Sequence, residues 1–211
     1  DVSNNSYTCT GGNSTTYTLS SIGNFVQVDC PASGTCPSVT VNSNTCSVPL
    51  AAVDNSVVVS LGSNAFGAIT NPDSISAIEC KQNHIVGGDW GICVGHVAGV
   101  ARVSRNYVAN ADKAIKFLNT SATAAAPNRA YGNVVVGTTA GSIGLYGHGS
   151  QNDKFYNNTV IVTAASFQAL TAGAEATAGG KGGCTNVLFA NNIVYVAAGV
   201  TASAIVAVDS T

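Results

Sequence analysis

Three cations recur along the middle of this chain at nearly even intervals. Arg102, Arg129 and Lys154 are 27 and 25 residues apart. A tyrosine follows the second and the third of them by two positions, as Tyr131 and Tyr156. Guanidinium and ammonium groups bind carboxylates, and Arg does so through two parallel hydrogen bonds. If the fold brings these residues together, the pattern predicts a site for a polyanion.

An asparagine stands four residues after each of these cations and sets the period of the chain. The segments QNHIVGG, RNYVANA, GNVVVGT, NNTVIVT and NNIVYVA share this anchor, at Asn83, Asn106, Asn133, Asn158 and Asn192. Two residues after each anchor stands Ile or Val, and three residues before it stands an apolar side chain. A second apolar register begins nine or ten residues after the first four anchors, at Ile92, Ile115, Ile143 and Phe167. This alternation predicts short strands, and no stretch carries a helical stripe.

Short strands in units of about 25 residues without helices predict a β-solenoid. Successive coils stack at about 4.8 Å, so equivalent positions form ladders. An inward asparagine at each coil corner can then hydrogen-bond the asparagine of the next coil. The alternative is a β-sandwich with ordinary Asn turns, which predicts no constant offset to the following isoleucine.

The pattern resembles the right-handed parallel β-helix of the pectate-lyase-like superfamily, whose coils often carry N-x-I/V at an asparagine-bearing corner. The resemblance covers residues 78–208 and implies one all-β domain with coils of about 23–28 residues. We predict a disulfide-rich N-terminal cap and first coils over 1–50, with Asn24 and Asn55 as earlier anchors. The β-helix coils then fill 51–211, with a flexible loop at 171–183. No signature of a particular pectate lyase, polygalacturonase or epimerase occurs.

The composition limits the class of protein. Hydrophobic residues make up 45% of the 211 residues and charged residues 9%, which predicts a globular domain with a Ser, Thr, Asn and Gly surface. The net charge of −2 excludes a generally basic nucleic-acid binder and a polybasic membrane protein. No apolar run approaches the roughly 20 residues of a membrane span. All basic residues and histidines lie between Lys81 and Lys181.

The cysteines and sequons predict a secreted, extracellular glycoprotein. Four of the seven cysteines lie between Cys9 and Cys46 without metal-site spacing, which favours disulfides. The odd count leaves one thiol free or paired with another chain. No signal peptide is visible, so we expect the mature form. Glycosylation sequons occur at Asn4, Asn13, Asn119 and Asn157.

Aligning the coils predicts a lateral face with two outward columns, Glu79–Arg102–Arg129–Lys154–Leu188 and Lys81–Ser104–Tyr131–Tyr156–Ala190. Like charges on adjacent strands are unfavourable without a partner, so the first column calls for an anion. An acidic polysaccharide is the expected partner, because it is linear and carries repeated carboxylates. The alternative is an ordinary solvated face on which Glu79 or Asp153 neutralises part of the charge.

Two carboxylates form a second candidate site. Asp89 and Asp112 each lie three positions before an isoleucine, so they should be neighbours on adjacent coils. Such a pair could bind calcium or share a proton, and a salt bridge to Lys113 is the simpler alternative. No other cofactor is expected.

The resemblance implies β-elimination of a uronate polymer of the kind found in cell walls. Arg102 and Arg129 would then neutralise the substrate carboxylate, with Lys81 and Glu79 completing the binding site. Lys154 would remove the proton, and Tyr131 or Tyr156 would protonate the leaving oxygen. The sequence leaves catalysis open, and if the protein is an enzyme we expect a polysaccharide lyase.

A non-catalytic coat, filament or adhesion protein is the alternative function. The run from Asn191 to Thr211 is nearly uncharged, and an exposed terminal coil can pair with another subunit. Self-association would proceed through the terminal coils or through a free cysteine. Neither interpretation involves nucleic acid or a membrane.

Overall fold

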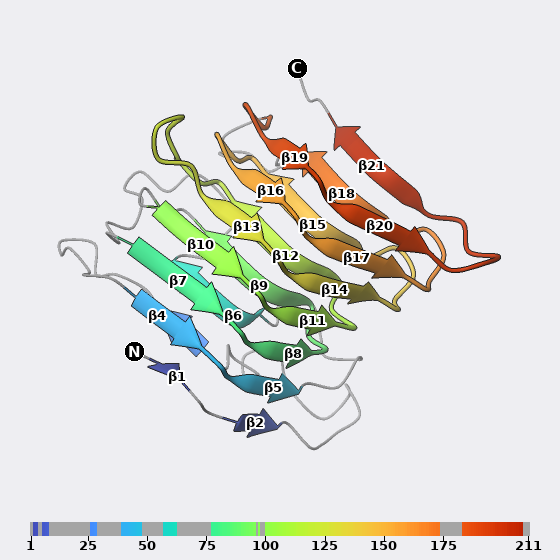
Figure 1. Ribbon diagram of the computed structural model, residues 1–211, viewed down its shortest axis with the longest axis horizontal. Coiled ribbons are helices and arrows are strands. Elements are labelled where there is room, and N and C mark those ends of the chain that lie inside the picture. Colours follow the sequence, from blue (N-terminus) through green and yellow to red (C-terminus); the bar gives the residue numbers. More distant parts are fainter. Residues whose placement is uncertain are drawn as a thin grey trace.

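The computed structural model describes residues 2–3, 6–8, 26–28, 39–47, 57–62, 77–95, 97, 100–173 and 183–208. All of the regular elements in these ranges are β-strands (Figure 1). Within the same ranges, no helix is long and apolar enough to cross a membrane.

The strands form three parallel sheets of seven strands each, which we name A, B and C. Sheet A comprises β1 (Val2–Ser3), β4 (Val39–Asn42), β7 (Ala77–Lys81), β10 (Val100–Ser104), β13 (Arg129–Tyr131), β16 (Lys154–Tyr156) and β19 (Leu188–Ala190). Sheet B comprises β2 (Ser6–Thr8), β5 (Thr45–Ser47), β8 (His84–Val86), β11 (Tyr107–Ala109), β14 (Val134–Gly137), β17 (Thr159–Val162) and β20 (Ile193–Val196). Sheet C comprises β3 (Val26–Val28), β6 (Val57–Gly62), β9 (Trp90–Gly95), β12 (Lys113–Leu118), β15 (Ile143–His148), β18 (Gln168–Gly173) and β21 (Ser203–Val208).

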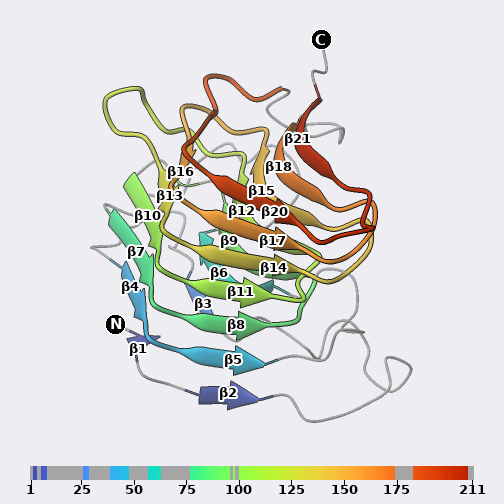
Figure 2. The ribbon, with the colours of Figure 1, turned by 45° about the vertical axis from the view of Figure 1, so that its right-hand side comes forward.

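Each coil contributes one strand to each sheet, and each strand pairs in parallel with its counterpart in the neighbouring coil. Figures 1 and 2 show the coils stacked in chain order, with β1 and β21 at opposite ends. The predicted β-solenoid is therefore confirmed as a parallel β-helix.

The core fills the space between the three sheets. The position three residues before each ladder asparagine is fully buried in the central coils, as at Cys80, Val103 and Phe155. The position two residues after the asparagine is equally buried, as at Ile85 and Val108. Both predicted core columns are confirmed, because side chains on a strand alternate between its two faces.

The predicted register of sheet C is wrong in two coils. Ile115 pairs with Leu145 rather than with Ile143, and Leu145 pairs in turn with Leu170. The connection from sheet B to sheet C is longer there than in the preceding coils, because five residues separate β14 from β15 and only three separate β11 from β12. Ile143 consequently occupies the outward place of Lys113.

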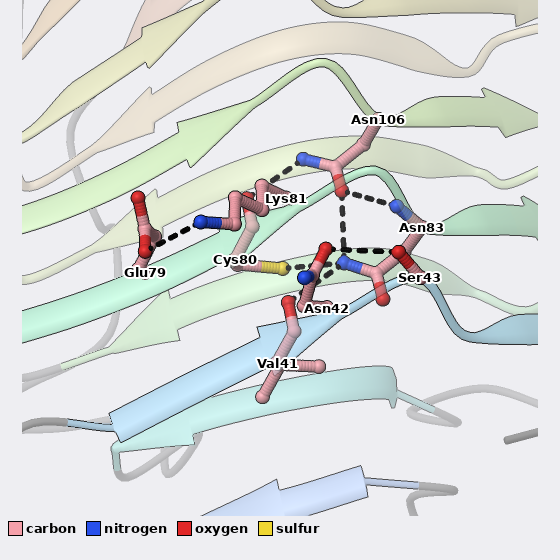
Figure 3. A network of polar contacts seen from close by, with 8 residues as sticks. All are labelled: Val41, Asn42, Ser43, Glu79, Cys80, Lys81, Asn83 and Asn106. Carbon is pink, nitrogen blue, oxygen red and sulfur yellow. Dashed lines mark hydrogen bonds and ion pairs between the residues drawn. The ribbon is translucent and has the colours of Figure 1, made fainter. Parts of the chain in front are cut away.

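A ladder of six asparagines runs along the corner between sheets A and B. Oδ1 of Asn83 accepts the backbone N–H and the side-chain amide of Asn44, at 3.0 and 2.9 Å. Asn83 donates in the same two ways to Oδ1 of Asn106, both at 2.9 Å (Figure 3). The second N–H of its amide reaches the carbonyl oxygen of Val41 at 3.1 Å.

The same arrangement continues through Asn133, Asn158 and Asn192, at 2.9–3.0 Å. The predicted five-member ladder is confirmed and gains Asn44, while Asn24 and Asn55 lie outside the described residues. The members from Asn83 to Asn158 pair both amide N–H groups and the amide oxygen, so they lie in the core with their side-chain hydrogen bonds satisfied.

The residue before each ladder asparagine turns the chain. These residues have φ between 52° and 63°, and they are Ser43, Gln82, Arg105, Gly132, Asn157 and Asn191. Asparagine and glycine adopt this left-handed conformation more readily than other residues. The two asparagines in Asn157–Asn158 thus have separate roles, since the first forms the turn and the second enters the ladder.

The N-terminal region contains strands of all three sheets, β1 to β5. The disulfides expected there do not include Cys46, which is a free thiol buried in the core and is the register partner of Ile85. Cys80 and Cys93 are also free and buried. Cys9, Cys30 and Cys36 lie outside the described residues.

The loop predicted at 171–183 begins later than expected. Thr171, Ala172 and Gly173 continue β18 and pair with the last residues of β15. Residues 174–182 lie outside the described residues.

Candidate anion-binding face

The predicted cation column forms on the outer face of sheet A. Arg102 pairs with Arg129, and Arg129 pairs with Lys154, as Cα partners on β10, β13 and β16. Glu79 precedes this row and Leu188 follows it, in the predicted order. We name Arg102, Arg129 and Lys154 the cation row. Its members follow one another along the long axis of the stack at about 4.8 Å per coil.

The neighbouring acidic residue does not neutralise the row. Glu79 binds Lys81 instead, with 2.9 Å between Nζ and Oε2 (Figure 3). Arg102 is exposed, and Arg129 and Lys154 are half-exposed. Among the residues that the structure describes, none of the three row members forms a salt bridge.

Asp153 is the other carboxylate that the sequence offers as a partner for the row. It is fully buried. Its two oxygens accept hydrogen bonds from Thr120 Oγ1 at 2.7 Å and from Asn128 Nδ2 at 2.9 Å. These bonds give the carboxylate a role inside the coil, where hydrogen-bonded partners offset the cost of its burial.

A second column lies beside the cation row and carries two aromatic rings. Tyr131 pairs with Tyr156, and their ring centroids are 5.3 Å apart with an interplanar angle of 6°. Lys81 and Ser104 precede them in register, as predicted. Both tyrosines are half-buried. The stacked pair offers an apolar surface with polar hydroxyl groups next to the cations.

The face extends further than the sequence predicted. Arg105 is exposed at the turn between sheets A and B, and a Cβ built on Gly132 would lie 3.8 Å from its Cγ. Beyond the turn, His84 and Tyr107 stack on the outer face of sheet B, with centroids 4.7 Å apart and an interplanar angle of 6°. The position of Arg105 directly before Asn106 was the available signal, because the residue before each ladder asparagine turns outward.

Five of the eight basic residues therefore gather on or beside the outer face of sheet A: Lys81, Arg102, Arg105, Arg129 and Lys154. Glu79 is the acidic residue within these two columns. The face is positive although the whole chain has a net charge of −2.

The two carboxylates of the predicted calcium site lie around a lysine. Lys113 Nζ is 3.4 Å from Asp89 Oδ1 and forms a close salt bridge with Asp112. Ser142 donates a further hydrogen bond to Asp112 at 2.9 Å. Lys113 thus neutralises the two carboxylates, as the salt-bridge alternative to a calcium site predicts. Within the described ranges, no group of three or more His, Cys, Asp or Glu side chains could hold a metal ion.

The charges at this cluster shift the titration of its members. Burial alone would raise the pKa of Asp112, but the hydrogen bond and charge of Lys113 outweigh it, and the pKa is lowered. Burial alone would lower the pKa of Lys113, but the two carboxylates outweigh it, and the pKa is raised. The cluster therefore fixes the turn into sheet C as a set of ion pairs.

The predicted glycosylation sites differ in accessibility. Asn157 is exposed at its turn. Asn119 is 1% exposed and Thr120 is fully buried, so a glycan on this sequon would require the coil to open. Asn4 and Asn13 lie outside the described residues.

The arrangement of sheets and the asparagine ladder define the class of protein as a parallel β-helix. No family model matches the chain, and no curated protein or solved structure matches it either.

Proposed function

We propose that the outer face of sheet A binds an acidic polysaccharide, whose chain lies along the axis of the β-helix. The observation that carries the proposal is the cation row, in which three consecutive coils present a cation and none of these cations forms a salt bridge in the described structure. Like charges on adjacent strands repel, so a polyanion that lies along the row gains by neutralising them.

A linear uronate polymer suits this row better than a compact anion. One carboxylate can meet one cation per coil along the axis, at about 4.8 Å per coil. The Tyr131–Tyr156 pair lies beside the row and can pack against sugar rings. Lys81 and Glu79 neutralise each other at one end of the face, so they contribute hydrogen bonds more than net charge.

The resemblance to right-handed β-helices of the pectate-lyase-like superfamily adds cleavage by β-elimination to this proposal. The proton on the carbon next to the carboxylate would pass to Lys154, and the glycosidic C–O bond would break as the C=C bond forms. Tyr131 or Tyr156 would protonate the leaving oxygen. Arg102 and Arg129 would stabilise the charge that develops on the carboxylate. Binding needs only the row, so we regard cleavage as the additional step.

The test is a titration of the protein with polygalacturonate oligomers, with neutral oligomers of equal length as the ligand control. Arg129 is the middle member of the row. We expect Arg129→Ala to weaken polygalacturonate binding about fivefold, the loss of roughly 1 kcal/mol for one exposed charge contact. We also expect affinity to fall as salt rises, because the charges are exposed to solvent.

Lys81→Ala is the matched variant, since the charge of Lys81 is already neutralised by Glu79. It should change affinity less than Arg129→Ala does. Equal binding of neutral oligomers, or an unchanged affinity in Arg129→Ala, would rule out the cation row. Release of unsaturated products, followed by ultraviolet absorbance, tests cleavage separately from binding.

A further inference from the structure

The last coil, formed by β19, β20 and β21, leaves part of the hydrophobic core open. Ile205 is 68% exposed, although its register partner Leu170 is 5% exposed and Leu145 before it is fully buried. Phe189 and Val194 occupy core columns in this coil and are only partly buried. The core columns that are buried in the central coils are therefore exposed to solvent at the last coil, where they form an apolar surface.

The backbone is open at the same place. Strands β19, β20 and β21 are each the last strand of their sheet, and β1, β2 and β3 are the last strands at the opposite end. Figure 1 shows β1 and β2 at one end of the stack and β19, β20 and β21 at the other. An edge strand presents unpaired N–H and C=O groups that can pair with a further strand.

The hydrogen bonds of the asparagine ladder all run in one direction, so the two ends of the stack differ. Every ladder residue from Asn44 to Asn158 donates its backbone N–H to Oδ1 of the asparagine in the following coil. Asn192 is the last member, and no acceptor for its backbone N–H lies among the described residues. Two C-terminal coils facing each other would bring donor against donor, which is unfavourable. A coil that offers an acceptor at this position fits instead.

The first coil of a second copy has the matching register. Val2 is in register with Val41, Tyr7 with Cys46 and Val26 with Val59, so the backbone of this coil continues the register of the three sheets. In the sequence, Asn5 precedes Ser6 as Asn192 precedes Ile193. Continued in register, the stack would set the Cα atoms of Val2, Tyr7 and Val26 over those of Phe189, Val194 and Ile205.

We propose that this 211-residue chain stacks head to tail, with the β1–β2–β3 coil of one copy on the β19–β20–β21 coil of another. The contact repeats the parallel coil-to-coil interface that already joins the neighbouring coils of one chain. It is heterologous and does not close, so it generates filaments. With seven coils per copy, the axial rise is about 34 Å per subunit, from about 4.8 Å per coil. The proposal does not depend on the cation row.

The test is sedimentation velocity of the full chain over a range of concentrations, followed by electron microscopy of the assembled fraction. We expect concentration-dependent polymers with an axial rise of about 34 Å. Ile205→Lys places a charge on the open core and should raise the concentration needed for assembly at least about tenfold. Its fold should remain intact because Ile205 is largely exposed, and the fluorescence of buried Trp90 checks this.

Ala165→Lys is the matched control, because Ala165 is exposed on a turn of the preceding coil and the substitution adds the same charge there. It should assemble like the parent chain. A monodisperse monomer at all concentrations, a closed dimer, or polymers that persist in Ile205→Lys would each overturn the proposal.

Discussion

Replacing Asn133 by alanine should destabilise the β-helix more than any exposed substitution. Asn133 is 1% exposed and makes four side-chain hydrogen bonds. Its Oδ1 accepts the backbone N–H and the amide of Asn106, at 2.9 and 3.0 Å. Its own amide donates to Asn158 Oδ1 and to the carbonyl oxygen of Val103, both at 2.9 Å.

The expected loss follows from what Asn133→Ala leaves unpaired. The backbone N–H of Asn106 loses its acceptor, while its amide keeps the carbonyl oxygen of Cys80 at 3.0 Å. Val103 O loses the amide of Asn133, and Asn158 Oδ1 keeps the backbone N–H of Asn133 at 3.0 Å. With about 1–3 kcal/mol for each unsatisfied buried group, we expect a loss of about 3–5 kcal/mol. A domain has about 5–15 kcal/mol in total, so the effect is large.

The measurement is unfolding by guanidinium, followed by the fluorescence of Trp90, the single tryptophan, which is 2% exposed. Asn157→Gly is the control, because Asn157 is exposed and its φ of 55° suits glycine. This control should change the free energy of unfolding by less than about 0.5 kcal/mol. If Asn133→Ala loses less than about 1 kcal/mol, or no more than the control, the ladder does not stabilise the fold as argued.

A second substitution at the same position tests the direction of the hydrogen bonds. Asn133→Asp keeps the acceptor for Asn106 but directs a carboxylate oxygen at the acceptors of Val103 and Asn158. Burial and these acceptors should raise the pKa of the introduced carboxyl group in the folded state. The loss of stability relative to the parent chain should therefore be smallest at low pH and grow as pH rises above about 4.

Three further outcomes are expected. The salt bridge to lysine outweighs burial and lowers the pKa of Asp112, so the free energy of unfolding should fall as pH drops below about 4, and Asp112→Asn should weaken this dependence in urea titrations. Burial raises the pKa of Cys46 to about 11 and that of Cys93 to about 12, so neither thiol should be alkylated at about pH 8 until the chain unfolds, as peptide mass spectrometry would show. A Cβ at Gly91 would lie 2.6 Å from the carbonyl oxygen of Ala114, so Gly91→Ala should cost about 1–3 kcal/mol and lower Tm by about 3–10 °C in calorimetry.

The repeat could be predicted because stacking forces like residues into like positions. An asparagine that recurs with constant offsets to apolar residues is expected only in a fold that brings these equivalent positions together in successive coils. The cation row followed from the same offsets, since it lies four residues before the ladder. The chemistry of the row did not follow, because a row of charges specifies an anion and not a reaction.

The errors arose where connections change length or direction. Asn44 lies 39 residues before Asn83, outside the range of the other spacings considered, and was missed. Ile143 was aligned with Ile115, whereas Leu145 is the true partner of Ile115, because the connection from β14 to β15 is longer than that from β11 to β12. Arg105 was missed because only its left-handed turn brings it beside the row. Burial of Cys46 depends on contacts between sheets that one segment does not reveal.

The constancy of the ladder has a consequence for insertions. Successive ladder asparagines are 39, 23, 27, 25 and 34 residues apart, yet the Nδ2 to Oδ1 distances between them are all 2.9–3.0 Å. The corner thus keeps its geometry whatever length of chain leaves and returns through the other connections. Foreign segments grafted into those connections should leave each coil in place, which makes this chain a scaffold on which loops can diversify while the corner stays fixed.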